Sequence, residues 1–145
     1  MATESDHIAL ANKNHAVLMH LLADVDKFPE WVSVAAFYKA VQIVEAVFVH
    51  KHDRCGHGHQ QRLSRLKSYG YKELYKHYRA LWSASSVARY LYDTASHKAY
   101  SSFTDYLPAD RVEKGIVKRR LHGVECEAVG LLSQKGKAAL KRLPF

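Results

Sequence analysis

Hydrophobic residues recur along most of this chain at steps of three and four, which is the spacing of one face of an α-helix. The first such face begins after Thr3 or Ser5, either of which can cap a helix, and it ends near residue 25. Its positions are Ile8, Ala11, His15, Leu18, Leu22 and Val25. A histidine on such a face is more typical of a hydrogen-bonded structural side chain than of a functional one.

The most apolar stretch, residues 29 to about 50, predicts a central helix that several neighbours bury. Pro29 suits the first turn, where its missing N–H needs no partner. Lys39, Gln42 and Glu45 form only a narrow polar stripe. About 20 apolar residues can also span a bilayer. Charges near the middle of a span cost roughly 2.5–3.5 kcal/mol each, which favours a core helix and no membrane partner.

The rest of the pattern predicts a shorter helix over residues 60–68, a long one over 71–92, a polar crossover over 93–108 and a helix over 110–132. The core face of the last helix is Ile116 or Val117, Leu121, Val124, Ala128 and Leu131. No segment alternates with a period of two. We therefore expect an all-α, antiparallel four-to-five-helix up-and-down bundle: one domain over residues 1–133, followed by a basic tail over 134–145.

Composition adds a possible partner to this picture. The formal net charge is +8 over 145 residues, with ten histidines in addition. Such a balance is typical of binding to an anion, most simply nucleic acid, although it also serves solubility. Cys55 and Cys126 alone make neither a disulfide framework nor a zinc knuckle, and the polar start is unlike a secretory signal, so we expect a cytoplasmic protein.

The segment after the central helix holds the densest group of candidate side chains. They are His50, His52, Asp53, Arg54, Cys55, His57 and His59. A metal site is the weakest interpretation, because no standard zinc spacing fits and glycines flank His57. We therefore predict neither a metal nor a cofactor.

RNA cleavage is the second interpretation of this segment. It needs a base, an acid and a cation for the phosphorane charge, and histidine and arginine supply these functions near neutral pH. His59 and Arg62 are three residues apart, so they share one face of a helix that begins near His59. We assign the acid or base to His59, phosphate binding to Arg62, an assisting role to Arg54 and a substrate contact to His57.

The third candidate group is Ser85-Ser86-x-x-Arg89-Tyr90 on the predicted helix over residues 71–92. Arg89 lies near the buried face and keeps its charge, so it needs either a carboxylate or an anionic ligand. Asp93 and Glu45 are candidate partners for an internal lock, and a phosphate is the alternative. We assign Arg89, together with Arg62, to phosphate binding in the candidate catalytic site. Tyr90 either stacks on a base as a substrate contact or hydrogen-bonds across the bundle.

Three segments together resemble HEPN-domain proteins, most closely their small stand-alone bacterial or phage members. The first is W-V-S-V-A-A-F-Y-K-A-V-Q-I-V-E-A at residues 31–46, the second is H-x-x-R at His59 and Arg62, and the third is S-S-V-A-R-Y at residues 85–90. The resemblance covers roughly residues 9–92, and the last helix carries no signature of the family.

The resemblance implies a helical bundle that often dimerises and acts on RNA. Members include metal-independent endoribonucleases, toxins and defence effectors, as well as non-catalytic RNA-binding or nucleotide-binding modules. Active members carry an arginine and a histidine four to six residues apart. Arg54 and His59 match this spacing, but across a glycine-containing loop.

We accordingly expect an RNA-binding protein, with metal-independent endoribonuclease activity of the toxin or defence type as its finer function. The alternative is a non-catalytic interaction module or a nucleotide-binding partner of another protein. The expected partners are RNA or another anionic nucleotide ligand, a second copy of the chain, and an antitoxin-type protein.

Overall fold

The computed structural model describes residues 1–145 and is an all-α bundle, which confirms the predicted fold class. Its only strands form a pair of two residues each. In chain order the elements are α1 (Glu4–Leu22), α2 (Pro29–His52), α3 (His59–Ser68), α4 (Lys72–Tyr90), β1 (Tyr92–Asp93), β2 (Lys98–Ala99), α5 (Phe103–Tyr106), α6 (Ala109–Arg111), η1 (Val112–Leu121), α7 (His122–Val129) and α8 (Gln134–Ala139).

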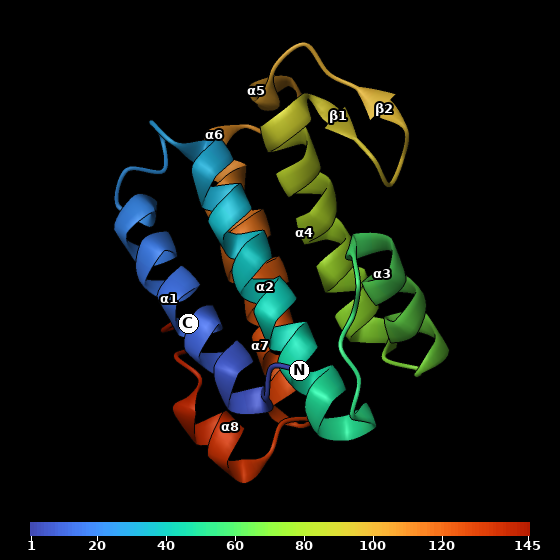
Figure 1. The fold of residues 1–145 in the computed structure, drawn as a ribbon. Helices are drawn as coiled ribbons and strands as arrows, with labels where there is room; N and C mark the ends of the chain where they lie inside the picture. The colour runs from blue at the N-terminus through green and yellow to red at the C-terminus, as the bar shows by residue number, and fades with distance from the viewer.

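The apolar helix α2 lies at the centre of the bundle, as its composition predicts. Figure 1 shows α1 beside it, α7 behind it and α4 on its other flank. By length and composition α2 is apolar enough to cross a membrane, yet 78% of its most apolar window is buried inside the bundle. Burial of this much apolar surface is the main source of stability in the fold.

The helix ends follow local chemistry. Thr3 caps α1 because its side chain accepts a hydrogen bond from the Asp6 N–H, and the Asp6 carboxylate accepts one from the Thr3 N–H. The helix α2 runs two residues beyond the predicted His50, to His52. It ends where Asp53 adopts a left-handed backbone with φ of 51°.

The predicted helix over residues 110–132 is divided into α6, η1 and α7, and η1 is wound as a π-helix. Its buried positions are Val112, Ile116, Val117 and Leu121, at steps of four, one and four residues. A π-helix has more residues per turn than an α-helix, so Ile116 and Val117 both reach the core. The spacing of an α-helix predicts only one of these two residues on the core face.

The crossover over residues 93–108 is partly extended and partly helical, as expected, and it contains the β1–β2 pair. The strands pair antiparallel, with Tyr92 opposite Ala99 and Asp93 opposite Lys98. Strands of two residues are too short to leave a period-two pattern in the sequence. The buried Asp93 carboxylate holds the turn by accepting hydrogen bonds from the Ala95 N–H and the Ser96 hydroxyl.

The C-terminal segment packs beside α1 and α7, where α8 is helical and Leu140 and Leu143 are buried. Its anchor is Glu125 of α7, which accepts a hydrogen bond from the Leu143 N–H at 3.0 Å. Glu125 also forms an ion pair with Lys39 of α2, and both side chains are 0% exposed. Burial lowers the pKa of Lys39, while the carboxylate beside it acts in the opposite direction.

Candidate nucleic-acid interface

The connector between α2 and α3 delivers His59 to the middle of the bundle. In Figure 1 it turns back at the end of α2 and climbs beside α4, so that α3 begins partway along α4. The His59 ring packs edge-on against Phe37, with 4.9 Å between centroids, and lies 6.1 Å from the Trp82 ring. His59 is thereby half-buried between α2 and α4.

Arg62 fixes the connector to α2 through Glu45. Its Nε donates to Glu45 Oε1 at 2.5 Å, and Glu45, 3% exposed, also accepts from the Gly56 N–H. A Cβ at Gly56 would lie 2.5 Å from Glu45 Oε1 and 2.7 Å from Arg62 Cγ, so a larger residue would displace this ion pair. Glu45 therefore balances the charge of Arg62, and the pair holds the loop that leads to His59.

The same guanidinium sets the hydrogen bonding of His59. Arg62 Nη1 lies 3.0 Å from His59 Nδ1, and because arginine can only donate, Nδ1 accepts. Burial, followed by the positive charges of Arg62 and Arg89, lowers the pKa of His59 to about 4. The ring is consequently neutral at pH 7, and its single proton lies on Nε2, which makes Nε2 a hydrogen-bond donor.

Arg89 of α4 lacks the carboxylate partner that an internal lock requires. Its Nη1 donates to the Tyr38 hydroxyl at 2.9 Å and its Nε donates to the Ser85 carbonyl at 3.2 Å. No carboxylate lies within ion-pair distance of Arg89. Both candidate partners are engaged elsewhere, Glu45 with Arg62 and Asp93 with its own turn. Arg89 therefore retains a positive charge that only neutral groups contact.

The structure brings together four of the six side chains that the sequence singles out. His59 and Arg62 are hydrogen-bonded, Arg89 contributes to the electrostatic field at His59, and Tyr90, 66% exposed, lies beside Arg89 with 5.0 Å between its ring and the guanidinium carbon. Arg54 and His57 lie apart from this group. They line another surface pocket, together with Met1, Asp53, Cys55 and Arg65. Arg54 and His59, whose spacing matches that of active HEPN-domain proteins, therefore do not lie in one cluster.

Two further tyrosines lie at the site, although no sequence signal marks them as functional. Tyr38 lies between Arg89 and His59: its hydroxyl accepts a hydrogen bond from Arg89, and its ring lies 6.3 Å from that of His59. Tyr78 is buried beside Arg62, and burial raises its pKa to about 12. Tyr38 and Arg89 are 51 positions apart in the chain, so only the tertiary fold reveals their contact.

The remaining histidines of the connector take other positions. His52 stacks on Tyr69, with 3.7 Å between ring centroids, and hydrogen-bonds to the Tyr71 hydroxyl at 2.8 Å. No group of three or more His, Cys, Asp or Glu side chains has the geometry to hold a metal ion. The candidate cluster is therefore one of arginines, a histidine and tyrosines.

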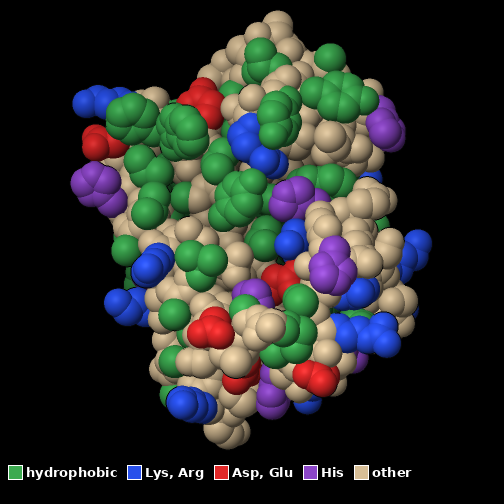
Figure 2. All heavy atoms as spheres, in the orientation of Figure 1, with side chains coloured by type: hydrophobic (Ala, Val, Ile, Leu, Met, Phe, Trp, Pro, Cys, Tyr) green, Lys and Arg blue, Asp and Glu red, His purple; other side chains and the backbone are tan.

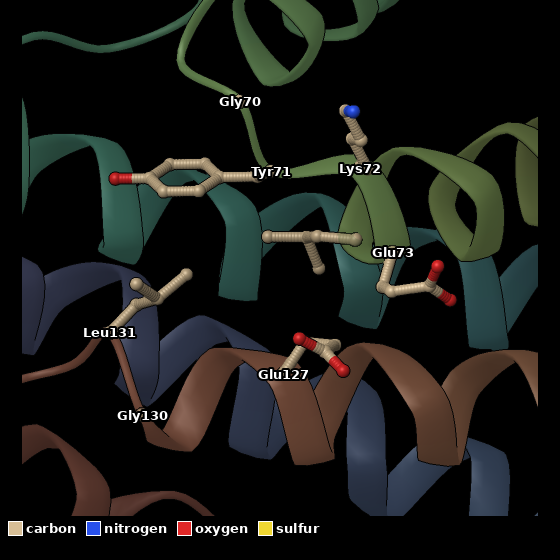
Figure 3. A pocket seen from close by; sticks show the side chains of 8 residues that line it. Gly70, Tyr71, Lys72, Glu73, Glu127, Gly130 and Leu131 are labelled. Carbon is tan, nitrogen blue, oxygen red and sulfur yellow. The ribbon is translucent and has the colours of Figure 1, made fainter.

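A separate pocket of about 430 Å³ lies between the start of α4 and the end of α7. Figure 3 shows Lys72 and Glu73 at one wall and Glu127 at the other. Two carboxylates make this pocket unsuitable for an anion, and it contains none of the residues that the sequence singles out. The cluster of His59, Arg62, Arg89, Tyr38 and Tyr90, which we call the His59–Arg89 cluster, is the better candidate for recognising phosphate.

Comparison of the chain with protein-family models, with curated proteins and with solved structures finds no match. The resemblance to HEPN-domain proteins thus remains a prediction from the sequence. A function has to be inferred from the chemistry of the cluster.

Proposed function

We propose that this protein binds RNA through the His59–Arg89 cluster. The observation that carries the proposal is Arg89, a half-buried guanidinium with no carboxylate partner, next to a neutral histidine with a free donor. An arginine fork suits phosphate oxygens, since its N–H groups match their geometry. The formal charge of +8 supports the proposal because it steers polyanions toward the surface.

In this proposal each side chain has a distinct role. Arg89 turns from Tyr38 to a phosphate, His59 Nε2 donates a second hydrogen bond, and the exposed Tyr90 ring offers a face on which a base can stack. Arg62 has a positioning role, because Glu45 already neutralises it and its Nη1 orients the His59 ring.

Metal-independent RNA cleavage, of the kind carried out by HEPN-type toxins and defence proteins, is the second candidate function. It is favoured by the proximity of an imidazole to an arginine that can stabilise the phosphorane. It requires more of His59, since the basic lone pair of the neutral ring is on Nδ1 and already accepts from Arg62. Before the ring can act as a base, Nδ1 must leave Arg62, or the proton must move from Nε2 to Nδ1 so that Nε2 can accept. Binding alone requires no such change, so it is the function that the geometry supports best.

One assay distinguishes the two functions. Purified full-length protein is incubated with total RNA in excess chelator, in parallel with His59→Ala and with His20→Ala, which removes an exposed histidine of α1. Binding without catalysis predicts that wild-type protein shifts the RNA in a gel and leaves it intact. Cleavage by the wild type and His20→Ala, but not by His59→Ala, would establish the nuclease. An unshifted, intact RNA would contradict both functions.

We also propose that two copies associate through an aromatic patch next to the cluster. Trp31 is 60% exposed, and together with Glu30, Val34, Ala88 and Arg89 it lines a pocket that adjoins Tyr90. Figure 2 shows hydrophobic side chains gathered on this half of the face, over α1, α2 and the end of α4. Contiguous exposed aromatic surface is typical of protein interfaces, and an antitoxin-type protein is the alternative occupant.

Association of two copies should double the mass that is measured in solution. Sedimentation at micromolar concentration should give about twice the chain mass of 16.5 kDa, and Trp31→Glu should return the protein to 16.5 kDa, because it places a charge in an apolar interface. Phe145→Glu, at an exposed apolar residue beside Lys118 of η1, is the matched control and should remain dimeric. A wild-type mass of one chain over the whole concentration range would exclude this association.

A further inference from the structure

A second, polar groove lies between α3, α4 and the turn joining β1 to β2, and Trp82 lines it. Its volume is about 500 Å³, which is within the range of small-ligand sites. The helix α3 contributes Gln60, Ser64 and Lys67, and α4 contributes Tyr75, Arg79 and Trp82. Gln60 directly follows His59, so the groove begins next to the His59–Arg89 cluster.

The charge of this groove is of one sign. Lys67 and Arg79 are exposed, neither forms an ion pair, and no acidic residue lines the groove. Lys76, one turn before Arg79 on α4, does form an ion pair, because its ammonium lies 3.0 Å from Glu73 Oε1. The groove thus presents two uncompensated cations at one site.

Aromatic side chains line the same groove as these cations. Tyr75 and Trp82 form part of the wall on α4, and His97 belongs to the β1–β2 turn. His97 has a left-handed backbone with φ of 60°, and its Nδ1 lies 3.1 Å from the Tyr92 hydroxyl, so its ring has a defined place at the groove. Basic side chains that alternate with aromatic rings are typical of surfaces that bind single-stranded nucleic acid.

We propose that this groove is a subsite for single-stranded RNA, occupied by the nucleotide next to the phosphate held at the His59–Arg89 cluster. Lys67 and Arg79 bind its phosphate, and the rings of Tyr75 and His97 contact its base. Trp82 links the two sites, because its ring lies 6.1 Å from that of His59 and also lines the groove. The inference rests on the proposed function and adds the strand form of the RNA and its path across α3 and α4.

The test measures the binding of a fluorescent 12-nucleotide single-stranded RNA to the full chain by anisotropy at several salt concentrations. The variants are Lys67→Ala with Arg79→Ala in one chain, Lys76→Ala as the matched control on α4, and Arg89→Ala. The double variant should bind at least tenfold more weakly, and its salt slope should fall by about 1.4, because it removes two contacts of roughly 0.7 each. Lys76→Ala should bind within about twofold of the wild type, because Glu73 already engages that charge.

Each other outcome has a definite meaning. If Arg89→Ala loses affinity while the double variant binds like the wild type, the subsite is wrong and RNA binding at the cluster stands. Equal losses in the double variant and Lys76→Ala would indicate general charge attraction and overturn the subsite. Equally strong competition by a double-stranded 12-mer would overturn the single-strand assignment. Absence of any binding by the wild type would remove the proposed function itself.

Discussion

Glu125→Ala should be the most destabilising single substitution that this structure suggests, lowering the free energy of unfolding by about 3–5 kcal/mol. The reason is that Lys39 is 0% exposed and would be left in the core without the carboxylate that balances its charge. The Leu143 N–H would also lose its acceptor, which loosens the C-terminal segment. Thermal unfolding should show a fall in Tm of about 10 °C or more for a chain of this size.

The pH dependence of this variant provides an independent check. Burial already lowers the pKa of Lys39, and removal of Glu125 lowers it further. The unfolded variant then binds more protons than the folded one over the interval up to the ordinary lysine pKa, so the stability of the variant should rise with pH there. The deficit relative to the wild type should therefore shrink toward alkaline pH.

A neutral pair distinguishes the loss of charge balance from the loss of packing. Lys39→Met combined with Glu125→Gln removes both charges and leaves an acceptor for the Leu143 N–H. It should cost clearly less than Glu125→Ala alone, because no unpaired ion is buried. A Tm for Glu125→Ala within 2 °C of the wild type would show that the pair contributes little.

Arg89→Ala should weaken RNA binding by about 10- to 100-fold, the effect of losing a charge-assisted hydrogen bond of about 1.5–3 kcal/mol. The salt slope should fall by about 0.7 for a single strand. Stability should change little, because Arg89 hydrogen-bonds only to the Tyr38 hydroxyl and the Ser85 carbonyl, both uncharged, and forms no ion pair. Anisotropy titration together with thermal unfolding measures both quantities.

Two control variants sharpen this prediction. Arg111→Ala removes the same charge from an exposed position on α6 and should bind within about twofold of the wild type. Arg89→Lys keeps the charge but not the planar fork, so its affinity should be intermediate. A loss of Tm without a selective loss of affinity in Arg89→Ala would instead favour the non-catalytic interaction module.

The fold was predictable where the residues of a single helix determine its position or its ends. The apolar length of α2 predicts its central position, and Thr3 predicts the start of α1. Pro29 marks the start of α2, Gly58 directly precedes α3, and Gly70 lies two residues before α4. The π-helical winding of η1 was not predictable, since α-helical spacing leaves open whether Ile116 or Val117 faces the core and does not include Val112. The spacing of apolar residues identifies a buried helix face only for an assumed number of residues per turn.

The candidate site was predictable only in part. The spacing of His59 and Arg62 indicated a shared helix face, and they are hydrogen-bonded. The partners of Arg89 were not predictable, because the expected carboxylates are engaged elsewhere and Tyr38 lies 51 positions away. The partner of Lys39, Glu125, lies 86 positions away on α7 and was not predictable for the same reason. Pairing between distant side chains depends on how the helices pack, which helical spacing alone does not specify.

The pKa of His59, followed by NMR through the imidazole resonances with and without single-stranded RNA, tests the central claim most directly. In the free protein it should be about 4. A phosphate bound between His59 and Arg89 adds negative charge beside the ring, so the pKa should rise toward the ordinary histidine value near 6.5. A His59 pKa that stays near 4 while RNA saturates the protein would show that the RNA lies elsewhere and would contradict the account.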